Sequence, residues 1–205
     1  MLENLKLLTP LSFKRLYHKT NNRLSGLNIN SFSKLHLGCG DNLIDGWANI
    51  DFNGWKGVIG HNLTKPLPVK DDSISFIFSE HFIEHITREE GLALLKDCYR
   101  VLKPGGVVRI VTPDLKAIFA SYENYRQNDA WKELGWTTGC QMLNHCVRDW
   151  GHQFIYDRNE LHLIMKEAGF SHVSDAPHRD SEFVELQNLE HRPFDNDLIV
   201  EAVKS

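Results

Sequence analysis

The sequence predicts an open α/β sheet in which strands alternate with helices. Several segments are short, nearly continuous runs of apolar or β-branched residues, as expected for strands covered on both faces, and Val107-Val108-Arg109-Ile110-Val111-Thr112 is the clearest of them. Longer segments with helical periodicity and capping residues lie between these runs. Strands are predicted near residues 34–37, 47–51, 57–60, 74–79, 107–112, 171–175 and 197–203.

Three helices are predicted between these strands. Thr87-Arg88-Glu89-Glu90 has the form of a capping box, and apolar residues then recur at helical spacing. Pro104-Gly105-Gly106 is predicted to end this helix. Asp157 caps a second helix, and Gly169 stands just past its end. A third helix is predicted over residues 115–126.

The chain is predicted to have two parts. Residues 1–30, where leucines interleave with lysines and arginines, are expected to form a helical segment or a cap, and residues 31–205 to form one α/β domain. In an alternative interpretation, a basic face of the first part touches an anionic substrate or a membrane surface. Residues 128–154 show little periodicity and are rich in Trp, Gly, His and Cys, so we expect a functional loop or lid there.

Composition narrows the class of protein. With 205 residues, of which 41% are hydrophobic and 24% charged, the chain is expected to form one domain of ordinary soluble character. A net charge of −4 argues against nucleic acid as a partner. No apolar run approaches the roughly 20 residues that span a bilayer, so stable membrane insertion is not expected. The four cysteines form no C-x-x-C pair and the N-terminus has no secretory signal. We therefore expect reduced thiols, no metal site and a cytoplasmic location.

The most informative stretch joins the first two predicted strands. Leu35-His36-Leu37 is followed by Gly38-Cys39-Gly40, and the second strand ends at Asp51. Glycines allow positive φ and a close approach of the backbone to a ligand. An acid at the tip of the next strand can accept hydrogen bonds from ribose hydroxyls. The full G-x-G-x-x-G pattern is absent because residue 43 is Leu, but the stretch still suggests a nucleoside-bearing cofactor.

Four segments follow one another in a characteristic order. They are HLGCG at 36–40, NID at 49–51, HNLTKPLP at 61–68 leading into ISFIFSEHFIEH at 74–85, and YRVLKPGG at 99–106. Together they resemble the class I S-adenosylmethionine-dependent methyltransferases, specifically the small bacterial type often associated with sugar and polysaccharide biosynthesis. The resemblance covers about residues 34–203 and implies a Rossmann-like seven-stranded, mostly parallel sheet with helices on both faces and an antiparallel last strand. It also implies that the protein transfers a methyl group from S-adenosylmethionine to a small-molecule or sugar-containing acceptor, with S-adenosylhomocysteine as the product.

The resemblance also assigns residues that bind the cofactor. Gly38-Cys39-Gly40 would line its methionine part, and Asp51 would hold the ribose hydroxyls. Asn62 and Leu63 would lie beside the adenine. Ser79 and His81 would stand at the end of the fourth strand, next to the reactive methyl group.

The sequence departs from the family pattern at two points. Only six residues separate Gly40 from Trp47, too few for a full crossover helix, so the helix after the first strand is predicted to be reduced to a turn. Asn62 stands where many relatives have Asp, which weakens an adenine contact without removing it, because an amide carbonyl still accepts a hydrogen bond.

The acceptor side requires different chemistry. Methyl transfer from a sulfonium is an in-line displacement, so the enzyme mainly aligns donor and acceptor. A hydroxyl acceptor would also have to lose its proton near neutral pH, for which histidine is the natural base. The candidates are His152, preferred slightly, His145 and His81. Arg148 is a candidate for binding an anionic group such as a sugar phosphate. In the alternative, the polar side chains of residues 144–153 only cap backbone groups.

Two other functions remain open. His81-Phe82-Ile83-Glu84-His85 has the H-x-x-E-H form of a zinc-peptidase motif, in which both histidines bind zinc, but it follows a predicted strand. A non-catalytic protein that binds S-adenosylmethionine is the second. In the methyltransferase interpretation, Glu84 and His85 are expected to order the site rather than to react. The methylated atom and a homodimeric state are left open.

Overall fold

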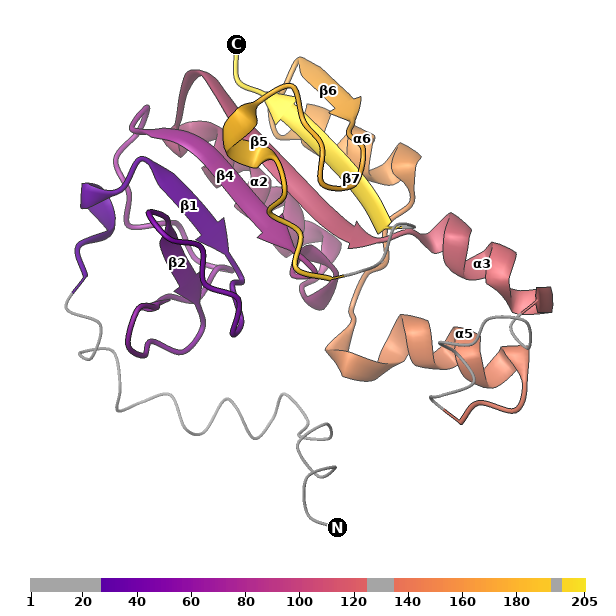
Figure 1. Cartoon of the computed structure of the whole chain (residues 1–205). Coiled ribbons are helices and arrows are strands. Elements are labelled where there is room, and N and C mark those ends of the chain that lie inside the picture. Colours follow the sequence, from indigo (N-terminus) through magenta and orange to yellow (C-terminus); the bar gives the residue numbers. More distant parts are fainter. Residues whose placement is uncertain (1–26, 125–134, 193–196) are drawn as a thin grey trace.

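The computed structural model of the chain describes residues 27–124, 135–192 and 197–205. Its centre is a seven-stranded sheet in the order β3-β2-β1-β4-β5-β7-β6 (Figure 1). β1 to β5 are mutually parallel, whereas β7 runs antiparallel to both β5 and β6. The strands are β1 (Lys34–Leu37), β2 (Ala48–Asp51), β3 (Ile59–Gly60), β4 (Ile74–Glu80), β5 (Leu102–Pro113), β6 (His172–Asp175) and β7 (Asp197–Val203). The predicted fold class is confirmed.

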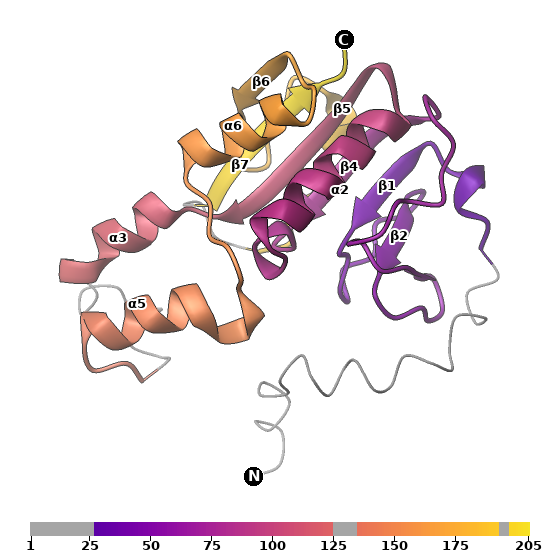
Figure 2. The same ribbon diagram turned by 180° about the vertical axis from the view of Figure 1, so that it is seen from behind.

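One face of the sheet is covered by α2 (Arg88–Val101) and α6 (Arg158–Glu167), which lie side by side (Figure 2). The predicted capping box begins α2, because the Thr87 hydroxyl accepts a hydrogen bond from the Glu90 N–H and the Glu90 carboxylate accepts one from the Thr87 N–H. The Asp157 carboxylate likewise accepts from the Glu160 N–H at the start of α6. Both predicted helix starts are therefore confirmed.

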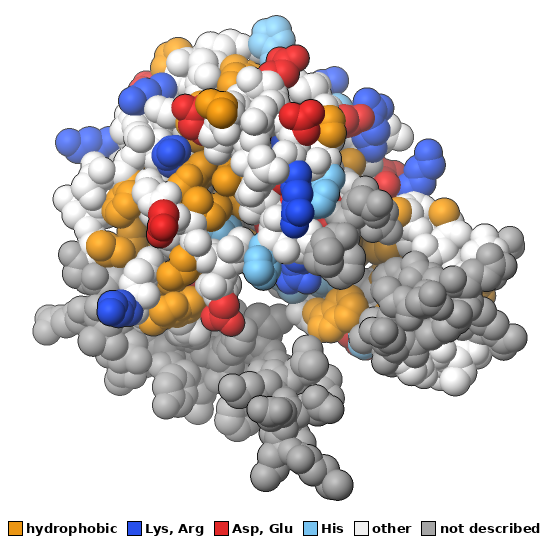
Figure 3. Space-filling view, in the orientation of Figure 1, with side chains coloured by type: hydrophobic (Ala, Val, Ile, Leu, Met, Phe, Trp, Pro, Cys, Tyr) orange, Lys and Arg blue, Asp and Glu red, His pale blue; other side chains and the backbone are white. Residues whose placement is uncertain are grey.

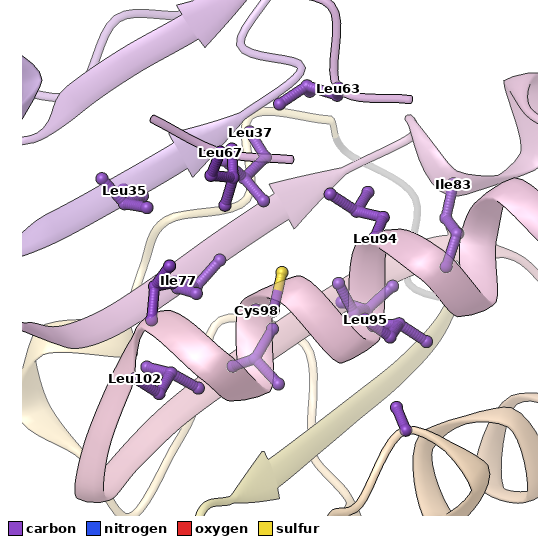
Figure 4. Close-up of a cluster of buried hydrophobic side chains, with 14 of the residues drawn as sticks. Leu35, Leu37, Leu63, Leu67, Ile77, Ile83, Leu94, Leu95, Cys98 and Leu102 are labelled. Carbon is purple, nitrogen blue, oxygen red and sulfur yellow. The ribbon is translucent and has the colours of Figure 1, made fainter. Parts of the chain in front are cut away.

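Apolar side chains of α2 fill the space above the central strands (Figure 4). Leu94, Leu95 and Cys98 of α2 are buried, as are Leu35 of β1 and Ile77 of β4. The helical spacing of the first three puts them on one face of α2, so the helix and the sheet share one core. The sequence pattern of this region predicts short apolar strands and a helix with apolar residues along one face, as the structure shows.

The opposite face is covered by the segment between β6 and β7. This segment contains the short 3-10 helix η7 (Val184–Leu186). Its Leu186 packs in a second apolar cluster with Trp47, Phe78 and Val107. Another 3-10 helix, η3 (Ile29–Ser31), lies near the start of the described residues and buries Ile29 in the main core. Residues 1–26 of the predicted N-terminal segment lie outside the described residues.

Two helices extend beyond the carboxyl end of β5. They are α3 (Leu115–Asn124) and α5 (Gly139–Arg148), and both views show them as a pair beside the sheet (Figures 1 and 2). The expectation of a loop over residues 128–154 was wrong for residues 139–148, which form α5, and residues 128–134 lie outside the described residues. Only Gly139, Met142 and Cys146 of α5 are buried. Such a narrow stripe of weakly hydrophobic residues gives little periodicity to detect.

The end of α2 also differs from the prediction. The helix ends at Val101, and β5 begins at the next residue. Pro104-Gly105-Gly106 lies inside β5, where the pairing with β4 shifts register. Gly105 has a φ of +78°, and its N–H donates to the Lys204 carbonyl. The two glycines therefore lie at an irregularity in β5 and do not end α2.

Candidate functional site

The candidate site lies where three neighbouring parallel strands end. Leu37 of β1 is paired with Ile50 of β2 on one side and with Ser79 of β4 on the other. The residues that follow these positions must therefore meet at one edge of the sheet. In open α/β sheets this edge is where ligands bind.

The glycine turn forms the floor of this edge. Gly38 and Gly40 have φ of +68° and +51°, and the N–H groups of Gly38 and Cys39 both donate to the Ile50 carbonyl. The described chain between this turn and Trp47 contains turns and no helix, which confirms the predicted loss of the crossover helix. The Cys39 side chain is buried, so only its backbone is available to a ligand.

Asp51 is attached directly to the glycine turn. One of its carboxylate oxygens accepts a hydrogen bond from the Gly40 N–H at 3.0 Å, and the other accepts from the Phe52 N–H at 2.7 Å. A Cβ built on Gly40 would meet no atom within 4 Å, so the space above this glycine is open. A Cβ on Gly38 would instead meet the Phe82 side chain at 2.6 Å. Gly40 thus faces open space, whereas Gly38 packs against the Phe82 ring.

Asn62 and Leu63 follow β3 on the same side. The His61 N–H donates to the Asp51 carbonyl at 2.9 Å, which fixes this segment beside the end of β2. The Asn62 side-chain carbonyl accepts from both the N–H and the hydroxyl of Thr64. That oxygen therefore caps a local turn, and the Asn62 side-chain N–H₂ is the group left for another partner. Leu63 is buried.

His81 directly follows β4 in a left-handed conformation with a φ of +49°. Its Nε2 lies 2.8 Å from Asp197 Oδ2, and its Nδ1 lies 3.4 Å from Glu84 Oε1. Both ring nitrogens therefore face carboxylates. Ser79, two residues earlier, is buried within β4.

Glu84 lies in the 3-10 helix η4 (Ile83–His85) and is fully buried. Its Oε2 accepts a hydrogen bond from the Thr112 hydroxyl at 3.1 Å. Burial raises the pKa of this carboxyl to about 7, although His81 opposes the shift. The Glu84 carbonyl accepts from the N–H groups of Gln153 and Phe154, so its backbone joins η4 to the segment after α5, and the ordering role expected for Glu84 stays a prediction.

His85 and His152 are brought together by this link. Their ring centroids lie 4.9 Å apart. The Nδ1 of His152 lies 2.7 Å from the Cys146 carbonyl oxygen, so it carries the proton and Nε2 carries the lone pair. Burial lowers the pKa of His85 to about 4 and also lowers the pKa of His152, so both rings are neutral at pH 7.

His145 has a different environment at the end of α5. Its Nδ1 pairs with the Asp149 carboxylate, and its ring packs against Trp136 and Trp150. Trp150, in the 3-10 helix η6 (Asp149–Gly151), stands between His145 and His152 and has a φ of +58°. The His152 ring therefore lies beside the His85 ring, whereas the Trp150 ring stands between His145 and His152.

The motif His81-Phe82-Ile83-Glu84-His85 does not have the geometry of a zinc peptidase. That motif needs two histidines one turn apart on a helix. Here His81 has a positive φ, only residues 83–85 are helical, and Nε2 of His81 faces Asp197. The zinc-peptidase alternative, in which His81 and His85 both bind zinc, is therefore wrong. The possible metal ligands that the described residues do bring together are Glu84, His85 and His152.

Sequence reasoning missed three residues around this site. Asp197, the first residue of β7, meets His81, and Glu80 accepts hydrogen bonds from the N–H groups of His191 and Arg192. The charge of Arg192 acts on Glu84 and on both neutral histidines. Antiparallel pairing of β7 with β5 could have indicated Asp197, because the start of β7 must then lie at the end of β5.

The surface of this region carries histidine and basic side chains between the sheet edge and the α3–α5 pair (Figure 3). A separate pocket of about 270 Å³ lies against α2, lined by residues that include Leu63, Pro66 and Arg100. Its lining lacks the glycine turn and Asp51, so it is distinct from the sheet edge. None of the described helices is long and apolar enough to cross a membrane.

Comparison with known proteins supports the same class of fold. Residues 47–110 match the model of a family described as a methyltransferase domain. No curated protein matches the chain in sequence. The chain is similar to a solved SAM-dependent methyltransferase from Archaeoglobus fulgidus, with 16% identity, a TM-score of 0.55 and coverage of 94% of this chain and 92% of that one.

A second similar structure is a SAM-dependent methyltransferase from Thermotoga maritima, described as a possible histamine N-methyltransferase. It shares 16% identity and a TM-score of 0.51, with coverage of 84% of this chain and 81% of that one. Similarity at these identities shows a shared fold. The family match over residues 47–110 bears out the predicted enzyme class at the level of a methyltransferase.

Proposed function

We propose that this methyltransferase acts on a hydroxyl group of a small-molecule or sugar-containing acceptor. The observation that supports the proposal is the meeting of two unlike groups of residues at one sheet edge. The glycine turn and Asp51 lie at the ends of β1 and β2, and the His85–His152 pair lies beyond the end of β4. A nucleoside cofactor suits the first group, and a polar acceptor suits the second.

The residues of the glycine turn fit the adenosyl cofactor. The open space above Gly40 gives room for a ligand beside the Asp51 carboxylate, which can accept hydrogen bonds from two ribose hydroxyls. Asn62 and Leu63 are assigned to the adenine, with the Asn62 N–H₂ as donor because its carbonyl is engaged by Thr64. When bound, S-adenosylmethionine supplies an activated methyl group and a sulfide leaving group.

We assign the acceptor side to His152. The hydrogen bond from Nδ1 to the Cys146 carbonyl leaves the Nε2 lone pair available to act on an acceptor hydroxyl. His81 is less suited because carboxylates face both of its nitrogens, and we assign it a positioning role beside Ser79. His145 is less suited because Asp149 and two tryptophans surround it. Arg148, exposed at the end of α5, is assigned to an anionic group of the acceptor.

Cofactor binding tests the first half of the proposal. Calorimetric titration of the full chain with S-adenosylmethionine should show one site with micromolar-range affinity. Asp51→Ala or Gly38→Val should remove binding, and Asp45→Ala, an exposed acid of the same connection, should keep it. A folded protein that binds neither S-adenosylmethionine nor S-adenosylhomocysteine would contradict the proposal.

Turnover tests the second half. Release of S-adenosylhomocysteine would be measured with a panel of sugar and sugar-phosphate acceptors. His152→Ala should lose turnover while it retains cofactor binding, and His162→Ala, a histidine paired with Asp175 away from the site, should behave as the unmodified protein. Intact turnover in both His152→Ala and His145→Ala would remove the assignment of a histidine to the acceptor.

A further inference from the structure

We propose that Glu84, His85 and His152 together form a binding site for one divalent transition-metal ion. Each of these residues offers a ligand atom, and the three atoms lie within 4.8 Å of one another. The residues come from two separate segments, η4 and the turn after α5, and hydrogen bonds from Gln153 and Phe154 to the Glu84 carbonyl hold the segments together. The cluster is therefore built by the fold rather than by neighbours in sequence.

Two of the three side chains have one polar atom already engaged and another that is available. Nδ1 of His152 is engaged by the Cys146 carbonyl. Oε2 of Glu84 is engaged by the Thr112 hydroxyl. This pattern of outer partners is the one that orients metal ligands in proteins.

The remaining Glu84 oxygen is the strongest single indication of a ligand. Oε1 is buried and makes no hydrogen bond to any described residue, and His81 Nδ1 lies 3.4 Å from it. A fully buried carboxylate oxygen without a hydrogen bond is costly unless something else satisfies it. A cation between Oε1 and the two imidazoles would do so.

The donor set indicates the kind of metal. Two neutral imidazoles and one carboxylate suit zinc, iron(II), cobalt(II) or manganese(II), whereas magnesium and calcium prefer oxygen ligands. Ligand atoms at about 2.1 Å from such an ion stand roughly 3.4 Å apart in a tetrahedral site. Small rotations of the two rings would therefore complete the site and leave a further position open.

The open position gives the site a role in methyl transfer, and this role rests on the proposed function. A metal lowers the pKa of an oxygen ligand. The acceptor hydroxyl would then lose its proton to water, its oxygen would form a bond to the methyl carbon, and the carbon–sulfur bond would break with its electron pair left on sulfur. In this arrangement the His152 lone pair binds the metal, so His152 acts on the acceptor hydroxyl through the metal, and this replaces the direct proton transfer to Nε2 in the metal-free form of the proposed function.

Cobalt(II) titration of the chelator-treated full chain tests the site directly. We expect visible absorption bands of a low-symmetry site that saturate at one equivalent and that zinc abolishes by competition. Glu84→Gln, His85→Ala and His152→Ala should each weaken binding by about 100-fold or more. His162→Ala is the matched control, because it removes a histidine that pairs with Asp175 outside the cluster, and it should leave the titration unchanged.

A substitution of Arg192 tests the site in a second way, because it is expected to strengthen metal binding, whereas loss of structure would weaken it. Its positive charge acts on all three ligands, so Arg192→Gln should bind cobalt more tightly than the unmodified protein. The inference is overturned if no one-equivalent spectrum forms, or if His162→Ala weakens binding as much as His152→Ala. S-adenosylhomocysteine binding, measured on the same samples, separates the two claims: retained binding without metal uptake would leave the proposed methyl transfer intact.

Discussion

Nε2 of His81 lies 2.8 Å from Oδ2 of Asp197, a contact between residues 116 positions apart. It joins the residue after β4 to the first residue of β7, at the edge where the candidate site lies. The antiparallel last strand thus contributes a side chain to the site as well as a hydrogen-bonded edge to β5.

Removal of the Asp197 carboxylate is expected to destabilise the fold. Both side chains of the pair are less than 10% exposed, so Asp197→Ala removes the carboxylate that faces a nearly buried His81 nitrogen. We expect a loss of about 1–3 kcal/mol in the free energy of unfolding, measured by urea denaturation. Asp175→Ala removes the partner of His162 at an exposed site and should cost about 1 kcal/mol or less. Equal losses in the two variants would contradict this account of the His81 contact.

His36 is expected to make stability depend on pH. Burial lowers its pKa to about 4, from an ordinary value of 6.5. Below pH 6.5 the unfolded chain takes up a proton that folded His36 does not, so the free energy of unfolding should fall as the pH falls from about 6.5 to about 4. The total contribution is about 3 kcal/mol.

His36→Gln should remove this part of the pH dependence, since glutamine does not titrate but can still hydrogen-bond Asn49. Denaturation series from pH 4 to 7 would measure it, with the exposed His172→Gln as control. Parallel stability curves for the unmodified protein and His36→Gln would refute the assignment.

The two glycines of the turn should differ in their tolerance of alanine. Both have positive φ, which costs an L-residue about 1–2 kcal/mol. Gly38→Ala additionally places a Cβ 2.6 Å from Phe82, and overpacking of this kind costs about 1–3 kcal/mol more. Thermal and urea unfolding should therefore rank Gly38→Ala below Gly40→Ala. The opposite order would show that Phe82 moves aside without cost.

Arg109 is expected to be the most sensitive charged residue of the sheet. It is fully buried in β5, and its guanidinium contacts Glu190, Glu201 and the carbonyls of Pro177 and Asp180. Arg109→Met leaves two buried carboxylates without their cation, so we expect a loss of about 3–5 kcal/mol in the free energy of unfolding.

Arg88→Met is the matched control for this change. Arg88 pairs with Glu160 and Glu167 at a partly exposed site between α2 and α6, so its removal should cost about 1 kcal/mol or less. Urea denaturation of both variants measures the difference. A loss at Arg109 no larger than that at Arg88 would mean that the two carboxylates find other partners.

Local signals in the sequence were sufficient to predict most of the sheet. The run from Val107 to Thr112, the capping box at Thr87 and the N-cap at Asp157 each act within a few residues, and each corresponds to an observed element. The turn in place of a crossover helix followed from chain length alone. These features depend on backbone geometry that a short segment determines by itself.

The parts that could not be predicted depend on distant residues. α5 buries only a narrow stripe against α3, so its own sequence carries little hydrophobic signal. The grouping of His85 with His152 depends on hydrogen bonds between η4 and residues 153–154, which no local pattern announces. The same is true of Asp197 beside His81. The individual site residues could be nominated from sequence, but their partners could not.

A structure of the full chain with bound S-adenosylhomocysteine tests the central claim most directly. We expect the ribose hydroxyls on the Asp51 carboxylate, the backbone of residues 38–40 along the amino-acid part, and the sulfur on the side of Ser79 and His81. A ligand in the pocket against α2 that Leu63 and Arg100 line, or Asp51 with no contact to the ribose, would contradict it.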